Sequence, residues 1–281
     1  MGRKGNSGYS NPDRRFGKDL ELGYSGSLGF TQHYLERLDG DLEPTPPQGA
    51  PAAGFTIWLK ADSGITLNGT SAVSEWADQS TNAIDFSQST TSAQPTFTSA
   101  NTILNNQPSV DFFNNDFLES NDNPVMNTTT GFCIYVVAKV NSTPSTFSGF
   151  YGRTNGTSWS TGWFSFYYAG KLRFCVDYWN TSTKRVELDL PSVSNVNIYK
   201  FHYDRTTITG QIIGPDADLD TQAQTTSDIN ASGNGVELNR LGSSAYDGSW
   251  DFGEFIYYNT PLNSAGQTET ENYLKTKYGI T

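Results

Sequence analysis

From Phe55 onward, the chain is a succession of short apolar or alternating runs separated by turn residues. Glycine, proline, asparagine and serine gather between the runs, and such clusters mark the ends of strands. The run over residues 132–140 is the strongest candidate for a central strand, because it is almost continuously apolar. This pattern predicts an all-β fold, a two-sheet antiparallel jelly-roll sandwich. The expected strands span residues 55–59, 109–113, 132–140, 162–168, 172–178, 185–190, 196–203, 207–213, 235–242 and 250–258.

The composition agrees with a β fold that has a substantial core. Apolar residues make up 35% of the 281 residues and charged residues only 17%, with 27 glycines. This mixture is typical of short strands and many turns, and not of a helical bundle. Aromatic residues reach 14%, and each buried ring removes a large apolar area from water. The chain can therefore fill the interior of a sandwich.

One short C-terminal helix is predicted over residues 265–277. Ser264 is its expected N-cap, because a serine hydroxyl can accept a backbone N–H of the first helical turn. Tyr273, Leu274 and Tyr278 are spaced so that they face inward, against the sandwich.

Residues 1–43 do not continue the strand pattern, and we expect them to form an extended docking arm. The segment is rich in glycine, serine and asparagine, with single aromatic residues among its positive charges. Such a segment orders by laying its rings and cations on a partner surface, although a disordered tail is the alternative. The expected contact residues of the arm are Arg3, Lys4, Tyr9, Arg14, Arg15, Phe16 and Tyr24.

The same part of the chain sets the domain boundary. Apolar residues between Leu28 and Leu38 have helical spacing, which predicts a short helix over residues 27–39. So short a helix needs support from the domain, a sister copy or a host structure. Prolines mark residues 44–53 as a linker. The lectin-like β-sandwich domain then covers residues 54–281.

The charge distribution limits the partners. The net charge is −11, yet residues 1–18 carry five positive charges against the single negative charge of Asp13. The acidic body repels nucleic acid and anionic lipid, so we do not expect nucleic acid as a partner. The chain has no run of about 20 apolar residues, so no membrane span is expected. Its first residues lack the apolar core of a signal peptide.

The two cysteines, Cys133 and Cys175, both lie in strand-like runs. A buried free cysteine behaves as a small hydrophobic residue. We therefore expect two reduced, buried thiols, with a single bridge between them as the alternative.

Six short motifs punctuate the domain, at residues 58–64 (Trp-Leu-Lys-Ala-Asp-Ser-Gly), 76–80, 94–97, 107–112, 253–262 and 271–279. Together they resemble the concanavalin A-like, laminin-G-type jelly-roll modules. The resemblance implies a sandwich fold and a buried or structural glutamate at Glu254. Modules of this type occur in structural proteins of tailed bacteriophages and in secreted bacterial carbohydrate-associated proteins. The resemblance is therefore specific for the fold and says little about function.

No catalytic pattern stands out, and we expect no enzymatic activity. A glycosidase on this fold would present carboxylates from one strand, as Glu-x-Asp-x-x-Glu. Glu187 and Asp189 lack the third member of that motif, and Asp251 and Glu254 break its alternation. The histidines of the chain have no nucleophile elbow beside them.

Three carboxylates at alternate positions, Asp216, Asp218 and Asp220, are a weak prediction of a Ca²⁺ site, because carboxylate oxygens are the ligands that Ca²⁺ prefers. The segment lacks the glycine and the closing glutamate of an EF-hand loop. A solvated acidic hairpin tip is the alternative interpretation. No other cofactor is expected.

Aromatic and polar side chains in two expected loops predict a surface that contacts a glycan. The residues are Arg153, Asn155, Trp159 and Trp179. A ring stacks on the apolar face of a sugar, while amide and guanidinium groups bond to its hydroxyls. The alternative is that these rings belong to the core or to a protein contact.

These features predict a non-enzymatic structural protein of a bacteriophage virion. Its arm, residues 1–43, would anchor to capsid or tail proteins, and the sandwich would be displayed as a capsid decoration or as a tail or fibre component. The displayed domain would stabilise the particle or contact a host surface polysaccharide. Assembly into a homo-oligomer through residues 27–42 is open. The alternative function is that of a free, secreted carbohydrate-binding module.

Overall fold

The structure, a computed structural model, describes residues 49–144, 147–155, 159–178, 180–224, 229–231, 233–242 and 248–281. These residues belong to one folded unit, Gly49–Thr281. The expected arm, with its helix over residues 27–39, lies outside the described residues. So do the arm residues Arg3, Lys4, Tyr9, Arg14, Arg15, Phe16 and Tyr24. Of the expected linker, residues 49–53 already belong to the folded unit.

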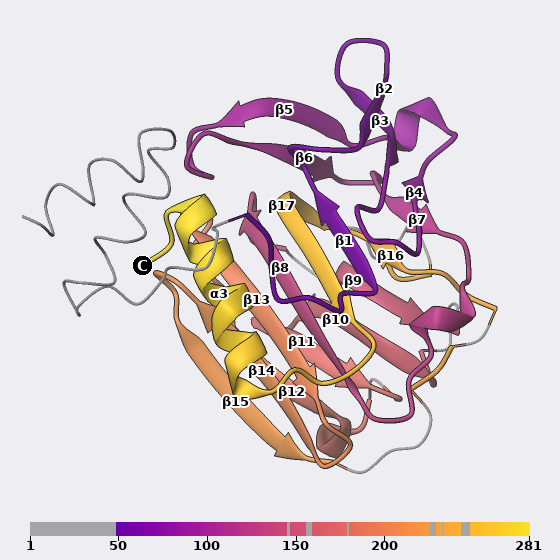
Figure 1. Cartoon of the computed structure of the whole chain (residues 1–281), viewed down its shortest axis with the longest axis vertical. Coiled ribbons are helices and arrows are strands. Elements are labelled where there is room, and N and C mark those ends of the chain that lie inside the picture. Colours follow the sequence, from indigo (N-terminus) through magenta and orange to yellow (C-terminus); the bar gives the residue numbers. More distant parts are fainter. Residues whose placement is uncertain are drawn as a thin grey trace, which may run out of the picture. The chain divides into compact units, whose positions relative to one another are not determined.

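Strands dominate the described residues (Figure 1). They are β1 (Ile57–Lys60), β2 (Ile65–Asn68), β3 (Ala72–Trp76), β4 (Phe86–Ser87), β5 (Thr96–Asn101), β6 (Gln107–Phe113), β7 (Leu118–Ser120), β8 (Phe132–Val140), β9 (Ser148–Thr154), β10 (Gly162–Tyr168), β11 (Lys171–Val176), β12 (Arg185–Asp189), β13 (Val196–Tyr203), β14 (Thr207–Ile213), β15 (Asp218–Ala223), β16 (Glu237–Leu238) and β17 (Ser249–Tyr258). The α-helix is α3 (Ser264–Tyr278), and 3₁₀ helices form at η1 (Thr91–Ala93), η2 (Pro124–Met126) and η4 (Ser182–Lys184).

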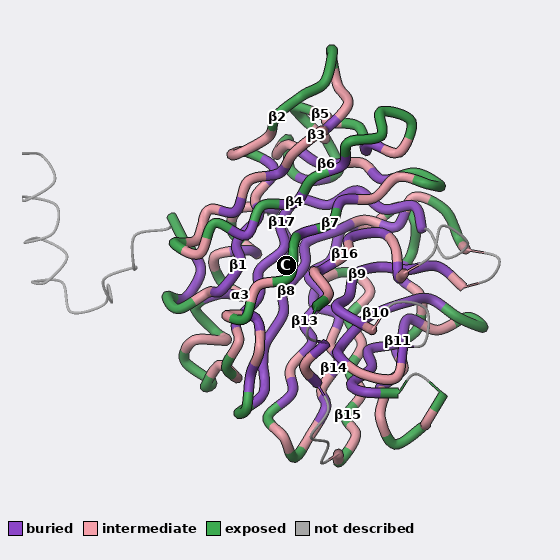
Figure 2. Tube along the Cα trace, turned by 90° about the vertical axis from the view of Figure 1, so that its right-hand side faces the viewer, coloured by how far each residue is buried: buried purple, intermediate pink, exposed green. Residues whose placement is uncertain are grey.

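The described strands join in one hydrogen-bonded sheet that folds over on itself. One half runs in the order β1–β17–β8–β13–β14–β15. The other half runs in the order β7–β16–β9–β10–β11–β12. Strands β6, β5, β3 and β4 connect the halves. The all-β prediction is confirmed, and β8 is central, between β17 and β13. Figure 2 shows such central strands buried along their length and the turns exposed.

The expected pair of separate sheets is replaced by a single, nearly closed one. The reason lies in β17, which pairs with different strands along its length. Residues 249–252 pair with β6, whereas residues 254–257 pair with β1. A register shift between Phe252 and Glu254 separates these two parts against β8. Because β17 pairs with both β1 and β6, the hydrogen-bonded sheet continues from one half through the connecting strands into the other half.

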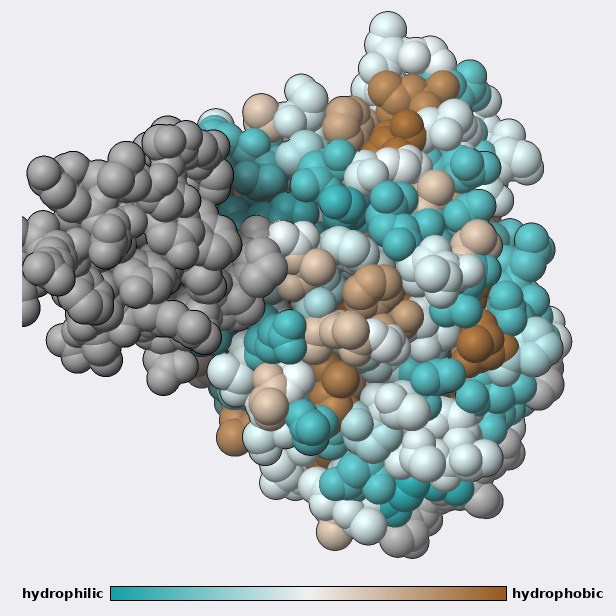
Figure 3. Space-filling model, in the orientation of Figure 1, coloured by the Kyte–Doolittle hydropathy of each residue, from teal (hydrophilic) through white to brown (hydrophobic). Residues whose placement is uncertain are grey.

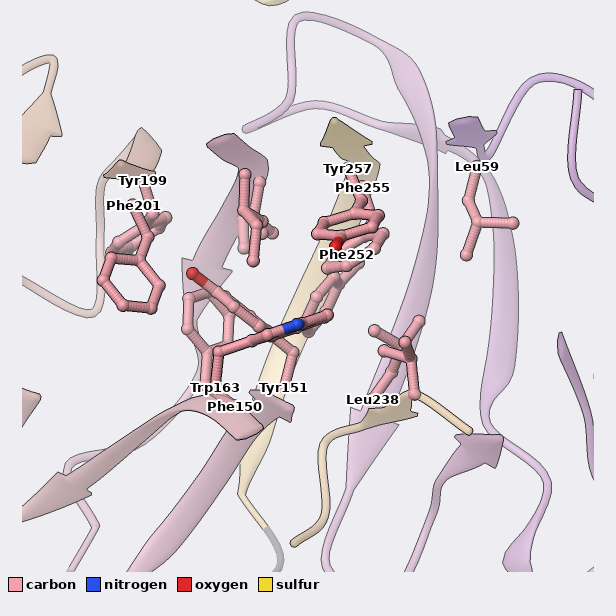
Figure 4. Packing of buried hydrophobic residues seen from close by; sticks show 14 of the residues in the cluster. Leu59, Phe150, Tyr151, Trp163, Tyr199, Phe201, Leu238, Phe252, Phe255 and Tyr257 are labelled. Carbon is pink, nitrogen blue, oxygen red and sulfur yellow. The ribbon is translucent and has the colours of Figure 1, made fainter. Parts of the chain in front are cut away.

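The two halves enclose a core of aromatic and aliphatic side chains. Figure 4 shows the rings of Phe150, Tyr151 and Trp163, from β9 and β10, pointing toward rings from β13 and β17. Phe150 stacks on Trp250 with centroids 4.2 Å apart, and Trp163 stacks on Tyr257 at 5.1 Å. Such ring pairs add to the stabilisation that buried apolar area provides. The aromatic core therefore joins the two halves of the sheet.

Helix α3 covers a second apolar cluster on the outer face of β8 and β13 (Figure 1). Leu274 and Tyr278 are buried there with Tyr135 and Ile198, and Tyr273 packs against the same cluster. The inward-facing residues of the helix were therefore predicted correctly. On the face that carries α3, hydrophilic residues cover most of the surface, and apolar residues form small separate patches (Figure 3).

The N-cap of α3 is Asn263, whose side-chain oxygen accepts the N–H of Gly266 at 2.9 Å. The expected cap, Ser264, is therefore wrong by one residue, because Ser264 is already the first residue of the helix. The helix ends at Gly279, which adopts the left-handed conformation that suits glycine. Within the described part of the chain, no helix has the length and apolar character needed to span a membrane.

A buried carboxylate ties α3 to the sheet. Glu254 on β17 is fully buried and pairs with Lys277 of the helix. Its carboxylate also accepts the O–H of Tyr273 at 2.6 Å and the indole N–H of Trp58 at 3.4 Å. Burial raises the pKa of Glu254, and the nearby Lys277 acts in the opposite direction. Glu254 is thus buried and structural, as the resemblance implies.

Cys133 and Cys175 are free and buried, as expected. Burial raises the pKa of both thiols, that of Cys133 to about 12. Because the thiolate is the reactive form, neither side chain is set up as a nucleophile at neutral pH.

Candidate functional site

The two ends of the nearly closed sheet meet at β12 and β15, which share no backbone ladder among the described residues. Aspartate carboxylates bridge them. Asp220 accepts the backbone N–H of Glu187 at 2.9 Å, and Asp218 accepts that of Asp189 at 2.8 Å. The other oxygen of each aspartate accepts the N–H of the next residue in β15, at 2.8 Å. Each carboxylate therefore satisfies one backbone donor from each edge strand.

An open groove of about 510 Å³ lies along this seam and is called the seam groove below. Two rows of polar side chains line it, one from each strand: Arg185, Glu187 and Asp189 from β12, and Asp218, Asp220 and Gln222 from β15. Lys171, Ser182 and Leu219 complete the lining. Each row covers four residue steps, or about 13 Å along a strand.

Ion pairs connect β11 and β12 on the outer face of the sheet beside the groove. Glu187 forms an ion pair with Arg173 at 3.0 Å and accepts a hydrogen bond from Arg185 at 2.7 Å. Lys171 pairs with Asp189 at 2.5 Å, and the carboxylate raises the pKa of that lysine. The side chain of Asp189 is nevertheless 80% exposed. The groove therefore offers charged groups that are held in place and still face solvent.

Rings lie over the outer face of β10 and β11, and Phe147, Trp159 and Tyr168 are called the aromatic layer below. Phe147 stacks on Tyr168 with centroids 4.1 Å apart and lies 5.8 Å from Trp159. The guanidinium of Arg173 lies 4.9 Å from the centre of the Tyr168 ring, within range of a cation–π contact. The same arginine pairs with Glu187. Arg173 therefore links the aromatic layer to the seam groove.

Arg153 was predicted to contact a glycan, and the structure contradicts this. Its side chain is fully buried on β9, every residue of which is buried. The guanidinium donates to Asp122 at 2.7 Å and to Asn127 at 2.8 Å. Arg153 therefore holds loops together beneath the surface and does not face solvent.

The other predicted glycan contacts have different outcomes. The amide of Asn155 donates to the hydroxyl of Ser160 at 2.8 Å and accepts the backbone N–H of Ser160 at 2.9 Å, so it stabilises its own loop. Trp159 belongs to the aromatic layer but is only 4% exposed, which agrees with the alternative of a packed ring. Trp179 lies outside the described residues.

The predicted Ca²⁺ site at Asp216, Asp218 and Asp220 is not formed. Asp216 accepts the side-chain amides of Asn195 at 3.0 Å and Asn197 at 2.8 Å, whereas the other two carboxylates bind backbone N–H groups of the seam. No cluster of three or more acidic, histidine or cysteine side chains suited to a metal occurs in the described residues. The alternative of an acidic hairpin tip holds for Asp216, which lies in the turn between β14 and β15, but not for Asp218 and Asp220, which lie within β15.

Carboxylates that were considered for catalysis lie in different surroundings. Glu187 and Asp189 line the seam groove, and each is engaged in ion pairs. Asp251 accepts amide N–H groups from Asn141 and Asn101 on the outer face of β17, while Glu254 is buried under α3. The structure thus does not bring Asp251 and Glu254 into one site.

Lys171, Arg173 and Arg185 were not predicted as site residues. The signal that could have found them is the strict alternation of residues 185–189, Arg-Val-Glu-Leu-Asp, with three charges on one face of a strand. Cross-strand pairing then sets Arg173 opposite Glu187 and Lys171 opposite Asp189.

No family model and no curated protein sequence matches the chain. Several solved structures are similar to it. An arabinofuranosidase complexed with arabinofuranosyl-α-1,2-xylobiose has a TM-score of 0.55 and 14% identity, over 75% of this chain and 52% of that one. The binding domain of Paraclostridial Mosquitocidal Protein 1 has a TM-score of 0.54 and 12% identity, over 78% and 52%. Trypanosoma rangeli sialidase in complex with sialic acid has a TM-score of 0.53 and 13% identity, over 92% and 40%.

These likenesses show a shared β fold and nothing finer. The chain spans about half of the length of the arabinofuranosidase and the mosquitocidal binding domain, and less of the sialidase. The shared fold is of the lectin-type β class that the sequence predicts. The matches do not show membership of the concanavalin A-like, laminin-G-type family. Because proteins with one fold can have many functions, a function for this chain has to be inferred from the residues of its site.

Proposed function

We propose that residues 49–281 form a non-enzymatic module that binds a saccharide in the seam groove. The observation that carries this proposal is the link that Arg173 makes between the aromatic layer and the polar groove. Saccharides present apolar ring faces and many hydroxyl groups, so their sites combine aromatic side chains with hydrogen-bonding groups. Tyr168, the exposed ring of the aromatic layer, supplies the first kind of contact, and the two rows of the groove supply the second.

Two further points support a saccharide as the ligand. The groove is open and polar, and its carboxylates and cations together both accept and donate hydrogen bonds, as sugar hydroxyls require. Two of the similar structures are described as complexes with a saccharide, the arabinofuranosidase and the sialidase. At 14% and 13% identity, those ligands suggest only a class of molecule to test.

The experiment is a glycan array followed by calorimetric titration of the full chain. The double variant Glu187→Gln, Asp189→Asn removes two carboxylates from the groove and should weaken binding at least about tenfold, as expected when charged hydrogen bonds are lost. The matched control is Glu119→Gln, an exposed carboxylate on β7, five steps away in the order of the sheet. Equal affinity of the double variant and the control would exclude the seam groove as the site.

Display of this module on a bacteriophage particle remains a prediction. It rests on residues 1–43, outside the described residues, so the groove neither supports nor opposes it. Sedimentation of the native protein in the lysate that produces it tests this point. Co-migration with particles of megadalton size, lost on deletion of residues 1–43, is expected for a virion component. A slow, free species would favour the secreted module.

A further inference from the structure

Carboxylates outnumber cations along the seam groove. The described lining has four carboxylates and two cations: Glu187, Asp189, Asp218 and Asp220 against Lys171 and Arg185. The chain as a whole carries a net charge of −11. The field around the groove is therefore negative, and it disfavours the approach of a negatively charged ligand.

The cations of the groove are also committed to partners. Lys171 pairs with Asp189 at 2.5 Å, and Arg185 pairs with Glu187 at 2.7 Å. Arg173, at the boundary with the aromatic layer, pairs with the same glutamate at 3.0 Å. An anionic sugar could bind these cations only by displacing a carboxylate or by lying beside one, and like charges in contact are strongly unfavourable.

An uncharged saccharide meets no such obstacle. Its hydroxyl groups can donate to carboxylates and accept from ammonium or guanidinium groups, so the existing ion pairs stay intact. An amino sugar gains an additional attraction to the exposed carboxylate of Asp189, whose side chain is 80% exposed.

The length of the groove adds a second restriction. Its two rows run side by side for about 13 Å, with Asp189 and Asp218 near one end and Arg185 and Gln222 near the other. Hydrogen-bonding groups thus continue along the whole seam and are not concentrated around a single point. Such a site matches a chain of several sugars better than one sugar ring.

We infer that the seam groove takes an extended oligosaccharide without negative charge, neutral or amino-bearing. The inference rests on the proposed saccharide-binding function, and it names the ligand class that the charges and the shape of the groove select.

The test is a glycan array with neutral, amino-bearing and uronate- or sialate-bearing oligosaccharides, probed with the full chain. Titrations then compare the neutral hits and a glucosamine hexamer with hexagalacturonate at low and high ionic strength. Hexagalacturonate should bind at least about tenfold more weakly than the best neutral hit. The variant Asp189→Lys reverses one exposed charge, so it should reduce the ratio between the affinities for the best neutral hit and for hexagalacturonate. Glu119→Lys on β7 should leave this ratio unchanged.

The outcomes separate the inference from the function on which it rests. Tight binding led by acidic oligosaccharides, and weakened in the Glu187→Gln, Asp189→Asn variant, would overturn the charge selectivity and leave saccharide binding in place. Equal affinity for a monosaccharide and its hexamer would overturn the inference that the groove binds an extended oligosaccharide. Absence of binding to every class on the array would overturn the proposed function and the inference with it.

Discussion

The carboxylate of Asp220 accepts the backbone N–H of Glu187 at 2.9 Å, across two strands that share no ladder. An edge strand normally leaves such donors open to pairing with another chain. In this protein, side chains of β15 occupy two of the edge donors of β12. The seam is thus closed to further strands while its polar side chains remain available to a ligand.

The variant Asp220→Asn tests the strength of this bridge. A carboxylate can accept both N–H groups, from Glu187 and from Thr221, whereas an amide can accept only one and turns its NH₂ toward the other. The free energy of unfolding should fall by about 1–3 kcal/mol. Urea denaturation provides the measurement, with Glu119→Gln as a control that should stay near wild type. An unchanged midpoint for Asp220→Asn would mean that the bridge contributes nothing to stability.

Glu254→Gln removes the carboxylate under α3 and leaves Lys277 in surroundings where only 13% of its side chain is exposed. We expect a loss of about 3 kcal/mol in the free energy of unfolding, as is usual when one partner of a buried pair is removed. Asp62, 3.1 Å from the same ammonium, limits the loss. Addition of Lys277→Met should recover part of the stability, since no charge is then left unpaired. If the double variant loses as much as the two single variants together, the pair is not coupled.

Asp111 lies opposite Asp251 on neighbouring strands, and its pKa is raised, first by burial and then by the charge of Asp251. The folded protein therefore binds this proton more tightly than the unfolded chain, whose value is near 3.8. As the pH rises from 3.8 through the raised pKa, this group lowers the free energy of unfolding. The free energy of unfolding of Asp111→Asn minus that of wild type should therefore be larger at neutral pH than below pH 3.8. Urea denaturation across this pH range measures this difference. A difference that does not change with pH would contradict the predicted effect of Asp111.

Gly162, the first residue of β10, and Gly170, in the turn between β10 and β11, form a matched pair. Both have positive φ, +98° and +84°, so alanine is strained at either position. A Cβ at Gly170 meets open space, whereas one at Gly162 would overlap the carbonyl oxygen of Arg153. Gly170→Ala should cost about 1 kcal/mol, and Gly162→Ala at least about 3 kcal/mol, because the backbone of β9 must move. Thermal melts compare the stability of the two variants. Similar losses of stability would show that the backbone of β9 moves away from the new Cβ at little cost.

Strands that end at clear turn signals could be predicted well. β13 and β14 begin and end at the predicted residues, because the turn at residues 204–206 separates two runs rich in β-branched and aromatic residues. β9 was missed because two glycines and Arg153 interrupt its apolar pattern. The burial of that arginine depends on Asp122 and Asn127, which lie 31 and 26 residues away in the chain. Local sequence gives no sign of such distant partners.

The candidate site was harder to predict than the fold. From the sequence, Glu187 and Asp189 were considered only as catalytic groups, and Asp218 and Asp220 only as metal ligands or residues of a hairpin tip. What places them in one groove is the closure of the sheet, which brings β12 next to β15. That closure follows from the pairing of β17 with both β6 and β1, a long-range relationship that no local pattern indicates.

The central position of β17 also bears on how the protein is made. This strand pairs with β1, β6 and β8, although almost all of the module precedes it in the chain. A ribosome has therefore released β1, β6 and β8 long before their common neighbour emerges. Until then these strands expose unpaired backbone groups, which makes the nascent chain prone to association. The module should complete its fold only after β17 has emerged, and slowly, because its decisive contacts join strands that lie far apart in the chain.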